Sequence, residues 1–235
     1  QPDAQSNHGQ SASSNLSLAR ELATMPWGHI KLLCDKCKND RSKAEFYIHE
    51  TVQNGWSRAL LLNHMDSGLY ERQGKALRNF ASTLPDSQSA LVQEVTRDPY
   101  QFDFLAIRKD YDEKELKDAL VNNISSFLLE LGTGFAFVGR EYRLKVGETE
   151  QWVDLLFYHY GLRCFGVVEV KITDFEASFI GQLGTYVSAV NHILRSESDQ
   201  PTIGLLICKT KDNVLAQYVL EGSSQPLGIS EYELS

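Results

Sequence analysis

Two carboxylates and a lysine lie inside neighbouring apolar segments of the sequence. "GVVEVK" (166–171) contains Glu169 and Lys171 two positions apart, which puts both side chains on the same face of a strand. Asp154 lies within the apolar "QWVDLLF", where an unpaired buried carboxylate would be costly. If the two segments form a hairpin, Asp154 and Glu169 converge and provide the hard oxygen ligands that Mg²⁺ prefers. Lys171 would then lie where it can hold an attacking water or stabilise transition-state charge on a phosphate.

Glu130 is a candidate for a third carboxylate. It lies near the end of the helix that precedes these strands and could reach the cation through a bound water. The spacing of the acidic residues and the lysine is loose, because Asp residues and Glu-x-Lys pairs also occur by chance. A structural Glu–Lys ion pair is therefore the alternative interpretation of "EVK".

The elements around these residues are predicted from hydrophobic periodicity. An apolar stripe with an acidic first turn predicts a helix, and three strands with short turns follow it. The chain then returns to helical spacing, followed by a strand, a short helix and a final edge strand. The predicted ranges are 112–134, 135–147, 151–160, 162–173, 175–195, 201–209, 213–221 and 226–234. This order predicts an α/β fold with a mixed sheet flanked by helices.

The upstream part of the chain is predicted to be helical. Residues 26–98 have three- and four-residue apolar spacing and form a small helical, winged-helix-like module, followed by a second domain over residues 99–235. Residues 1–25 are expected to be a flexible tail because their start is polar and rich in Ser. Since the first residue is Gln1, we expect a truncated or processed chain.

Composition narrows the function classes. With 42% hydrophobic residues the chain can bury a core, and no apolar run is long enough to span a bilayer. The four cysteines do not suggest a disulfide scaffold, so we expect a cytoplasmic protein. A net charge of −8 argues against general electrostatic binding to nucleic acid, but residues 26–84 hold nine basic and six acidic residues. The expected contacts to a nucleic-acid backbone are Arg58, Arg72, Lys75 and Arg78.

Several longer segments resemble the YhcG-type family of the PD-(D/E)XK nuclease superfamily. They are "FLLELGTGFAFVGREYRL", "VDLLFYHYGLRCFGVVEVK", "GQLGTYVSAV" and "PTIGLLICK", with "WGHIKLLCDK", "FYIHETVQNGWSR" and "LYERQGKALRNF" upstream. The resemblance covers roughly residues 26–235, including the latter part of that family's N-terminal helical domain. It implies a restriction-endonuclease-like core.

The resemblance also implies roles for individual residues. Asp154 matches the motif aspartate, Glu169 and Lys171 the (D/E)XK pair, and Glu130 the acidic residue of the preceding helix. Gln182 and Tyr186 match a QxxxY element, and their four-residue spacing puts them on one helix face.

The function implied is metal-dependent hydrolysis of phosphodiester bonds. We expect Mg²⁺ as the cofactor, with Mn²⁺ as an alternative, and DNA as the partner, with RNA not excluded. Endonuclease and exonuclease action both stay open, as does a homo-oligomer. The alternative function is a non-catalytic nucleic-acid-binding or assembly protein that keeps the nuclease fold.

Overall fold

The computed structural model describes residues 7–234 and divides the chain into two compact units, residues 1–71 and 72–235. This division precedes the boundary predicted near residue 98. No helix among the described residues is both long and apolar enough to cross a membrane.

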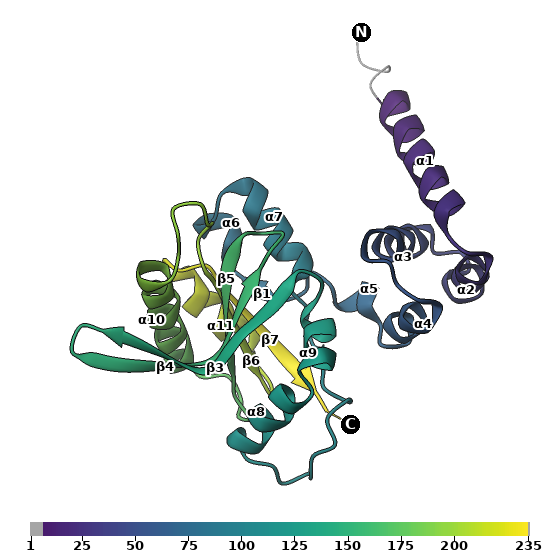
Figure 1. Ribbon diagram of the computed structural model, residues 1–235. Coiled ribbons are helices and arrows are strands. Elements are labelled where there is room, and N and C mark those ends of the chain that lie inside the picture. Colours follow the sequence, from purple (N-terminus) through teal and green to yellow (C-terminus); the bar gives the residue numbers. More distant parts are fainter. Residues whose placement is uncertain (1–6, 235) are drawn as a thin grey trace. The chain divides into compact units, whose positions relative to one another are not determined.

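The first unit is made of helices (Figure 1). They are α1 (Asn7–Thr24), α2 (Trp27–Cys37), α3 (Arg41–Asn54), α4 (Arg58–Asp66) and α5 (Leu69–Arg72), the last of which ends at the first residue of the second unit. The Asp40 and Ser57 side chains cap the amino ends of α3 and α4, and Gly55 ends α3 in the left-handed conformation. Of the predicted tail, residues 7–24 form the helix α1, and residues 1–6 lie outside the described part.

The second unit is built on a mixed sheet. Its strands are β1 (Leu77–Arg78), β2 (Tyr100–Gln101), β3 (Phe135–Val146), β4 (Thr149–His159), β5 (Cys164–Val170), β6 (Ile203–Cys208) and β7 (Leu227–Glu233). The order across the sheet is β1-β7-β6-β5-β4-β3, and β2 pairs with β7 outside this path. The strands β3, β4 and β5 are antiparallel, whereas β5, β6 and β7 run parallel. The predicted mixed sheet is confirmed.

Helices cover both faces of this sheet (Figure 1). On one face α8 (Glu113–Asn122) and α9 (Ile124–Leu131) contribute to a core with Leu155 and Val168. On the other face α10 (Ala177–Ile193) and α11 (Asn213–Glu221) pack with Leu156 and Val167. The remaining helices are α6 (Phe80–Thr83) and α7 (Asp86–Val95).

Two predicted elements differ from the structure. The helix expected over residues 112–134 is interrupted at Asn123, whose backbone leaves the helical region and whose side-chain amide donates to the Ala119 carbonyl. The final strand is not at the sheet edge, because β7 pairs with β6 on one side and with β1 on the other.

Candidate active site

The two motif carboxylates meet where β4 separates from β5. The antiparallel ladder pairs Leu155 with Val168, so the next step in the same register places Asp154 opposite Glu169. Beyond this point β4 continues with β3 alone, as a two-stranded ribbon. The prediction that Asp154 and Glu169 lie on adjacent strands is therefore confirmed.

Glu169 is the most buried group of the site. Its side chain is 2% exposed, its Oε1 lies 3.0 Å from Nζ of Lys171, and its Oε2 has no hydrogen-bond partner among the described residues. Burial, followed by the negative charge of Asp154, raises the pKa of Glu169 to about 7, although Lys171 opposes the shift. A buried carboxylate with one unpaired oxygen is a position where a cation would be favourable.

Helix α8 contributes two further charged groups that the sequence analysis did not identify. Nζ of Lys117 lies 2.6 Å from Oδ2 of Asp154 and 2.7 Å from Oε1 of Glu113. The same Glu113 oxygen lies 3.3 Å from Nζ of Lys171, so one carboxylate connects the two lysines. The only sequence signal was the acidic first turn of the predicted helix, which also has an ordinary explanation in the helix dipole.

The charges in this cluster stabilise one another. Burial alone would lower the pKa of both lysines, but the carboxylates outweigh it: Asp154 and Glu113 raise the pKa of Lys117, and Glu169 raises that of Lys171. For Glu113, burial is opposed by Lys117 and Lys171, which together lower the pKa of its carboxyl. Both lysines and Glu113 are thus held in their charged forms.

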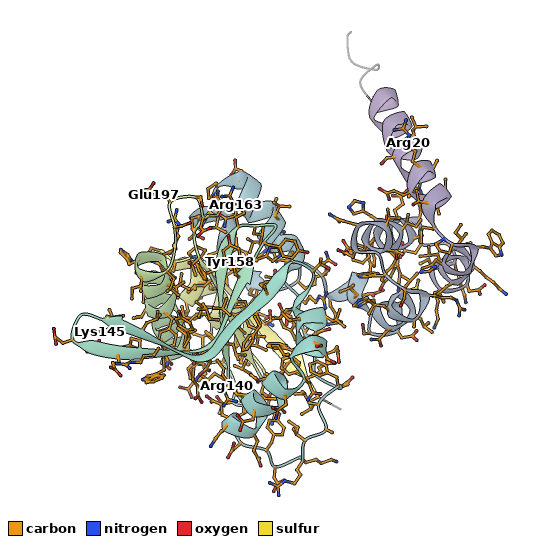
Figure 2. All side chains as sticks on the ribbon, in the orientation of Figure 1. Arg20, Arg140, Lys145, Tyr158, Arg163 and Glu197 are labelled. Atoms are coloured by element: carbon orange, nitrogen blue, oxygen red, sulfur yellow. The ribbon has the colours of Figure 1, made fainter. Side chains whose placement is uncertain are left out.

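An ion pair fixes α8 beside the strands. Arg140 of β3, labelled in Figure 2, has its guanidinium 2.6 Å from Oδ1 of Asp118, the residue that follows Lys117. The Asp112 side chain caps the start of α8 and forms a capping box with Glu115. These contacts place Glu113 and Lys117 against the ends of β4 and β5.

Helix α10 contacts the site through an aromatic ring. Nζ of Lys171 lies 5.6 Å from the centre of the Phe179 ring in α10. Farther along α10, the Gln182 amide donates a 2.7 Å hydrogen bond to the Tyr186 hydroxyl, as expected for residues one helical turn apart. Tyr186 is buried in the core that also contains Val153, next to Asp154 in the sequence.

Glu130 lies in a different environment from the one predicted. Its Oε1 lies 2.5 Å from the Arg72 guanidinium and accepts a 2.8 Å hydrogen bond from the backbone N–H of Gln101, while its Oε2 lies 3.2 Å from the Arg97 guanidinium. Both carboxylate oxygens are therefore used in a buried ion cluster. The structure does not bring Glu130 together with Asp154 and Glu169; Glu113 is the carboxylate that α8 and α9 supply to the pair.

The four basic residues expected to contact nucleic acid do not form one exposed face. Arg72 is buried against Glu130, which corrects its assignment to a solvent-facing surface. Arg78 is half-buried and donates to the Gly74 and Ala76 carbonyls. Lys75 is exposed in the second unit, whereas the exposed Arg58 belongs to the first unit and donates to a backbone carbonyl of α2.

The residues present fit a small divalent cation. Asp154 and Glu169 offer adjacent carboxylates, and each has one oxygen without a hydrogen-bond partner among the described residues, although Oδ2 of Asp154 lies 2.6 Å from Nζ of Lys117. Within residues 7–234 no group of three or more His, Cys, Asp and Glu side chains is arranged to hold a metal. Asp154 and Glu169 are the residues that would hold such a cation, and water and phosphate oxygens would supply its other ligands, as is common for Mg²⁺.

Comparisons with solved structures give partial overlaps. A repair endonuclease from Pyrococcus abyssi is 20% identical, with a TM-score of 0.34 over 55% of this chain and 49% of that one. A structure of EndoMS in complex with double-stranded DNA is 18% identical, with the same TM-score over 55% of this chain and 48% of the other.

Comparisons with sequences are more extensive. The protein named "Putative nuclease YhcG" from Escherichia coli (strain K12) is 34% identical over 212 residues, which cover 88% of this chain and 55% of that protein. The chain thus spans about half the length of this relative. A family model described as the DUF1016 N-terminal domain matches residues 8–72, and one described as the YhcG PDDEXK nuclease domain matches residues 93–235. The nuclease-domain model matches more than half of the chain, so the chain belongs to the YhcG family of PD-(D/E)XK nucleases.

Proposed function

We propose that this protein hydrolyses phosphodiester bonds in DNA and that it depends on Mg²⁺, with Mn²⁺ as an alternative. The observation that carries the proposal is the carboxylate pair at the β4–β5 fork, with Asp154 partly buried and Glu169 buried. Nζ of Lys171 lies 3.0 Å from Glu169, and Oε2 of Glu169 has no hydrogen-bond partner among the described residues. Membership of a nuclease family supports the reaction class.

Asp154 and Glu169 are the residues we assign to cation binding. A divalent cation bound between them would polarise the scissile phosphate and lower the pKa of a water molecule. Lys171 is the group placed to orient that water, because its ammonium can donate hydrogen bonds while Glu169 and Glu113 hold it in position. The water oxygen would form a bond to phosphorus and give up one proton to solvent, while the bond to one ester oxygen breaks and that leaving oxygen takes up one proton from solvent.

Gln182 and Tyr186 are proposed as supporting residues of the site. Their mutual hydrogen bond fixes the Gln182 side chain on α10, one turn beyond Phe179, which contacts Lys171. From there Gln182 can orient a water molecule or a phosphate oxygen, and Tyr186 holds Gln182 in place. Among the described residues, neither side chain is hydrogen-bonded to Asp154 or Glu169.

We also propose that the helical first unit positions nucleic acid. Two exposed cations support this proposal: Arg58 in the first unit, and Lys75 just after its end. Contacts to phosphates are independent of base sequence, so these residues would contribute affinity and not specificity.

The experiment is a cleavage assay with labelled linear, nicked, branched and single-stranded DNA, and with a matched RNA, each with and without Mg²⁺. Wild-type protein should cleave only with the cation, and Asp154→Asn should neither cleave nor bind Mg²⁺ in a calorimetric titration. As a matched control, Asp110→Asn changes an exposed aspartate in the turn before α8, outside the carboxylate pair. Binding of DNA by the wild type without cleavage of any substrate would instead favour the non-catalytic function. Equal Mg²⁺ binding by the wild type and Asp154→Asn would place the cation elsewhere.

A further inference from the structure

Lys117 occupies an unusual position for a residue outside the (D/E)XK motif. Its ammonium lies between Asp154 and Glu113, at 2.6 Å and 2.7 Å, and its side chain is only 18% exposed. Asp154, whose side chain is 14% exposed, has no other ion-pair partner among the described residues. The charge that balances Asp154 is therefore supplied from α8.

The site contains one ammonium for each carboxylate of the pair. Lys171 neutralises Glu169 and Lys117 neutralises Asp154, while Glu113 contacts both lysines. A divalent cation between Asp154 and Glu169 would place more positive charge where the two ammonium groups already lie. Positive charges close to one another repel strongly in a partly buried site. Cation binding therefore requires the ammonium group of either Lys117 or Lys171 to move away from its carboxylate.

Lys117 is the ammonium that can withdraw at lower cost. Nζ of Lys117 also lies 2.7 Å from Glu113, so Lys117 would keep one ion pair after moving away from Asp154. Nζ of Lys171 lies 3.0 Å from Glu169, the most buried carboxylate of the site, and 3.3 Å from Glu113. Moving Lys171 would expose Glu169 to the larger desolvation penalty.

We infer that Lys117 is a positioning residue that holds Asp154 in the absence of a cation and competes with the divalent cation for this carboxylate. The inference rests on the proposed function. The cation binds only those molecules in which Asp154 is free of Lys117. Its apparent affinity is therefore the intrinsic affinity multiplied by the fraction of such molecules. If Lys117 holds Asp154 in about nine-tenths of the molecules, the reduction is roughly tenfold.

The test measures Mg²⁺ and Mn²⁺ affinity by calorimetry on the full chain at one fixed pH. Lys117→Met removes the competing charge, and Lys117→Gln does so while keeping a hydrogen-bond donor for Asp154, in case the Met variant does not fold. Both variants should bind the cation roughly tenfold more tightly. Lys117→Arg keeps the charge and should bind like wild type. Lys114→Met, an exposed lysine of the same helix, is the matched control and should change nothing.

A second readout separates competition from a purely structural ion pair. Without a cation, Lys117→Met should unfold at a lower temperature than wild type, because Asp154 is left buried without its ion-pair partner. Saturating Mg²⁺ should raise the unfolding temperature of this variant more than that of the wild type. If the wild type binds the cation and the Met and Gln variants bind it equally or more weakly, the inference about Lys117 is overturned but the proposed function is not. Absence of cation binding in the wild type would overturn the proposed function as well.

Discussion

Glu169→Gln tests the electrostatic description of the site through the pH dependence of stability. Burial and Asp154 raise the pKa of Glu169 from the ordinary 4.5 to about 7 in the folded protein. A group with a raised pKa stabilises the folded state below its unfolded pKa, and that stabilisation is lost as the pH rises through the folded pKa. At about 1.4 kcal/mol per pKa unit, the wild type should lose roughly 3 kcal/mol of unfolding free energy between about pH 4.5 and 7.

Gln resembles the protonated form of Glu169, so the variant should lack this loss. The quantity to measure is the difference in unfolding free energy between wild type and Glu169→Gln, from hydrogen exchange of the β4 and β5 amides without divalent cations. These amides report on the second unit independently of the first. Titration of groups shared by both proteins cancels in the difference, apart from the direct neighbours Asp154, Lys117, Lys171 and Glu113.

The expected curve is a difference that falls from below pH 5 to about pH 7 and is then constant. Saturating Mg²⁺ should reduce the fall, because a cation stabilises the ionised carboxylate in the folded protein. Parallel stability curves for the two proteins across this range would refute the reasoning, since they would mean that Glu169 ionises as easily in the folded as in the unfolded chain.

Three further predictions follow from the same contacts. Lys171→Ala should lower the cleavage rate by roughly 10²–10³-fold and leave Mg²⁺ affinity within a fewfold of wild type; an unchanged rate in the cleavage assay would remove Lys171 from the chemistry. Arg72→Met should destabilise the second unit by about 3 kcal/mol in calorimetric unfolding, because it removes one charged partner of the buried Glu130. A variant that is as stable as wild type but binds DNA more weakly would contradict the description of Arg72 as a buried structural residue. Arg58→Glu combined with Lys75→Glu should weaken DNA binding and flatten its salt dependence in a fluorescence titration; if both stay as in wild type, the helical unit does not contact the phosphate backbone.

The strands of the site could be predicted because their signal is local. Apolar runs with short turns define β3, β4 and β5 in chain order, and consecutive antiparallel strands usually pair with each other. The pairing then follows from the turn, which is why Asp154 and Glu169 could be placed on adjacent strands from the sequence. Helix α10 was predictable for the same reason, and the Gln182–Tyr186 bond follows from helical spacing.

The charged partners could not be predicted because they depend on how helices pack on the sheet. Glu130 and Glu113 lie on the same predicted helix, and the sequence offers no measure of which one faces the strands. The break at Asn123 separates them: α8 brings Glu113 and Lys117 to the carboxylate pair, whereas α9 brings Glu130 to Arg72. Likewise, Arg72 looked like a surface charge only because its buried partner lies far away in the sequence.

By itself, the sequence determined the family, through its resemblance, and the mixed α/β core, through strand periodicity. It also placed Asp154 and Glu169 on adjacent strands, because hairpin register is set by neighbouring residues. Only the tertiary structure decided which ions surround this pair. The partners of Asp154 and Glu130 are 37 and 58 residues away in the chain, at Lys117 and Arg72. Such contacts depend on the packing of whole helices against the sheet, and a charge acquires its function, its burial and its pKa only through that packing.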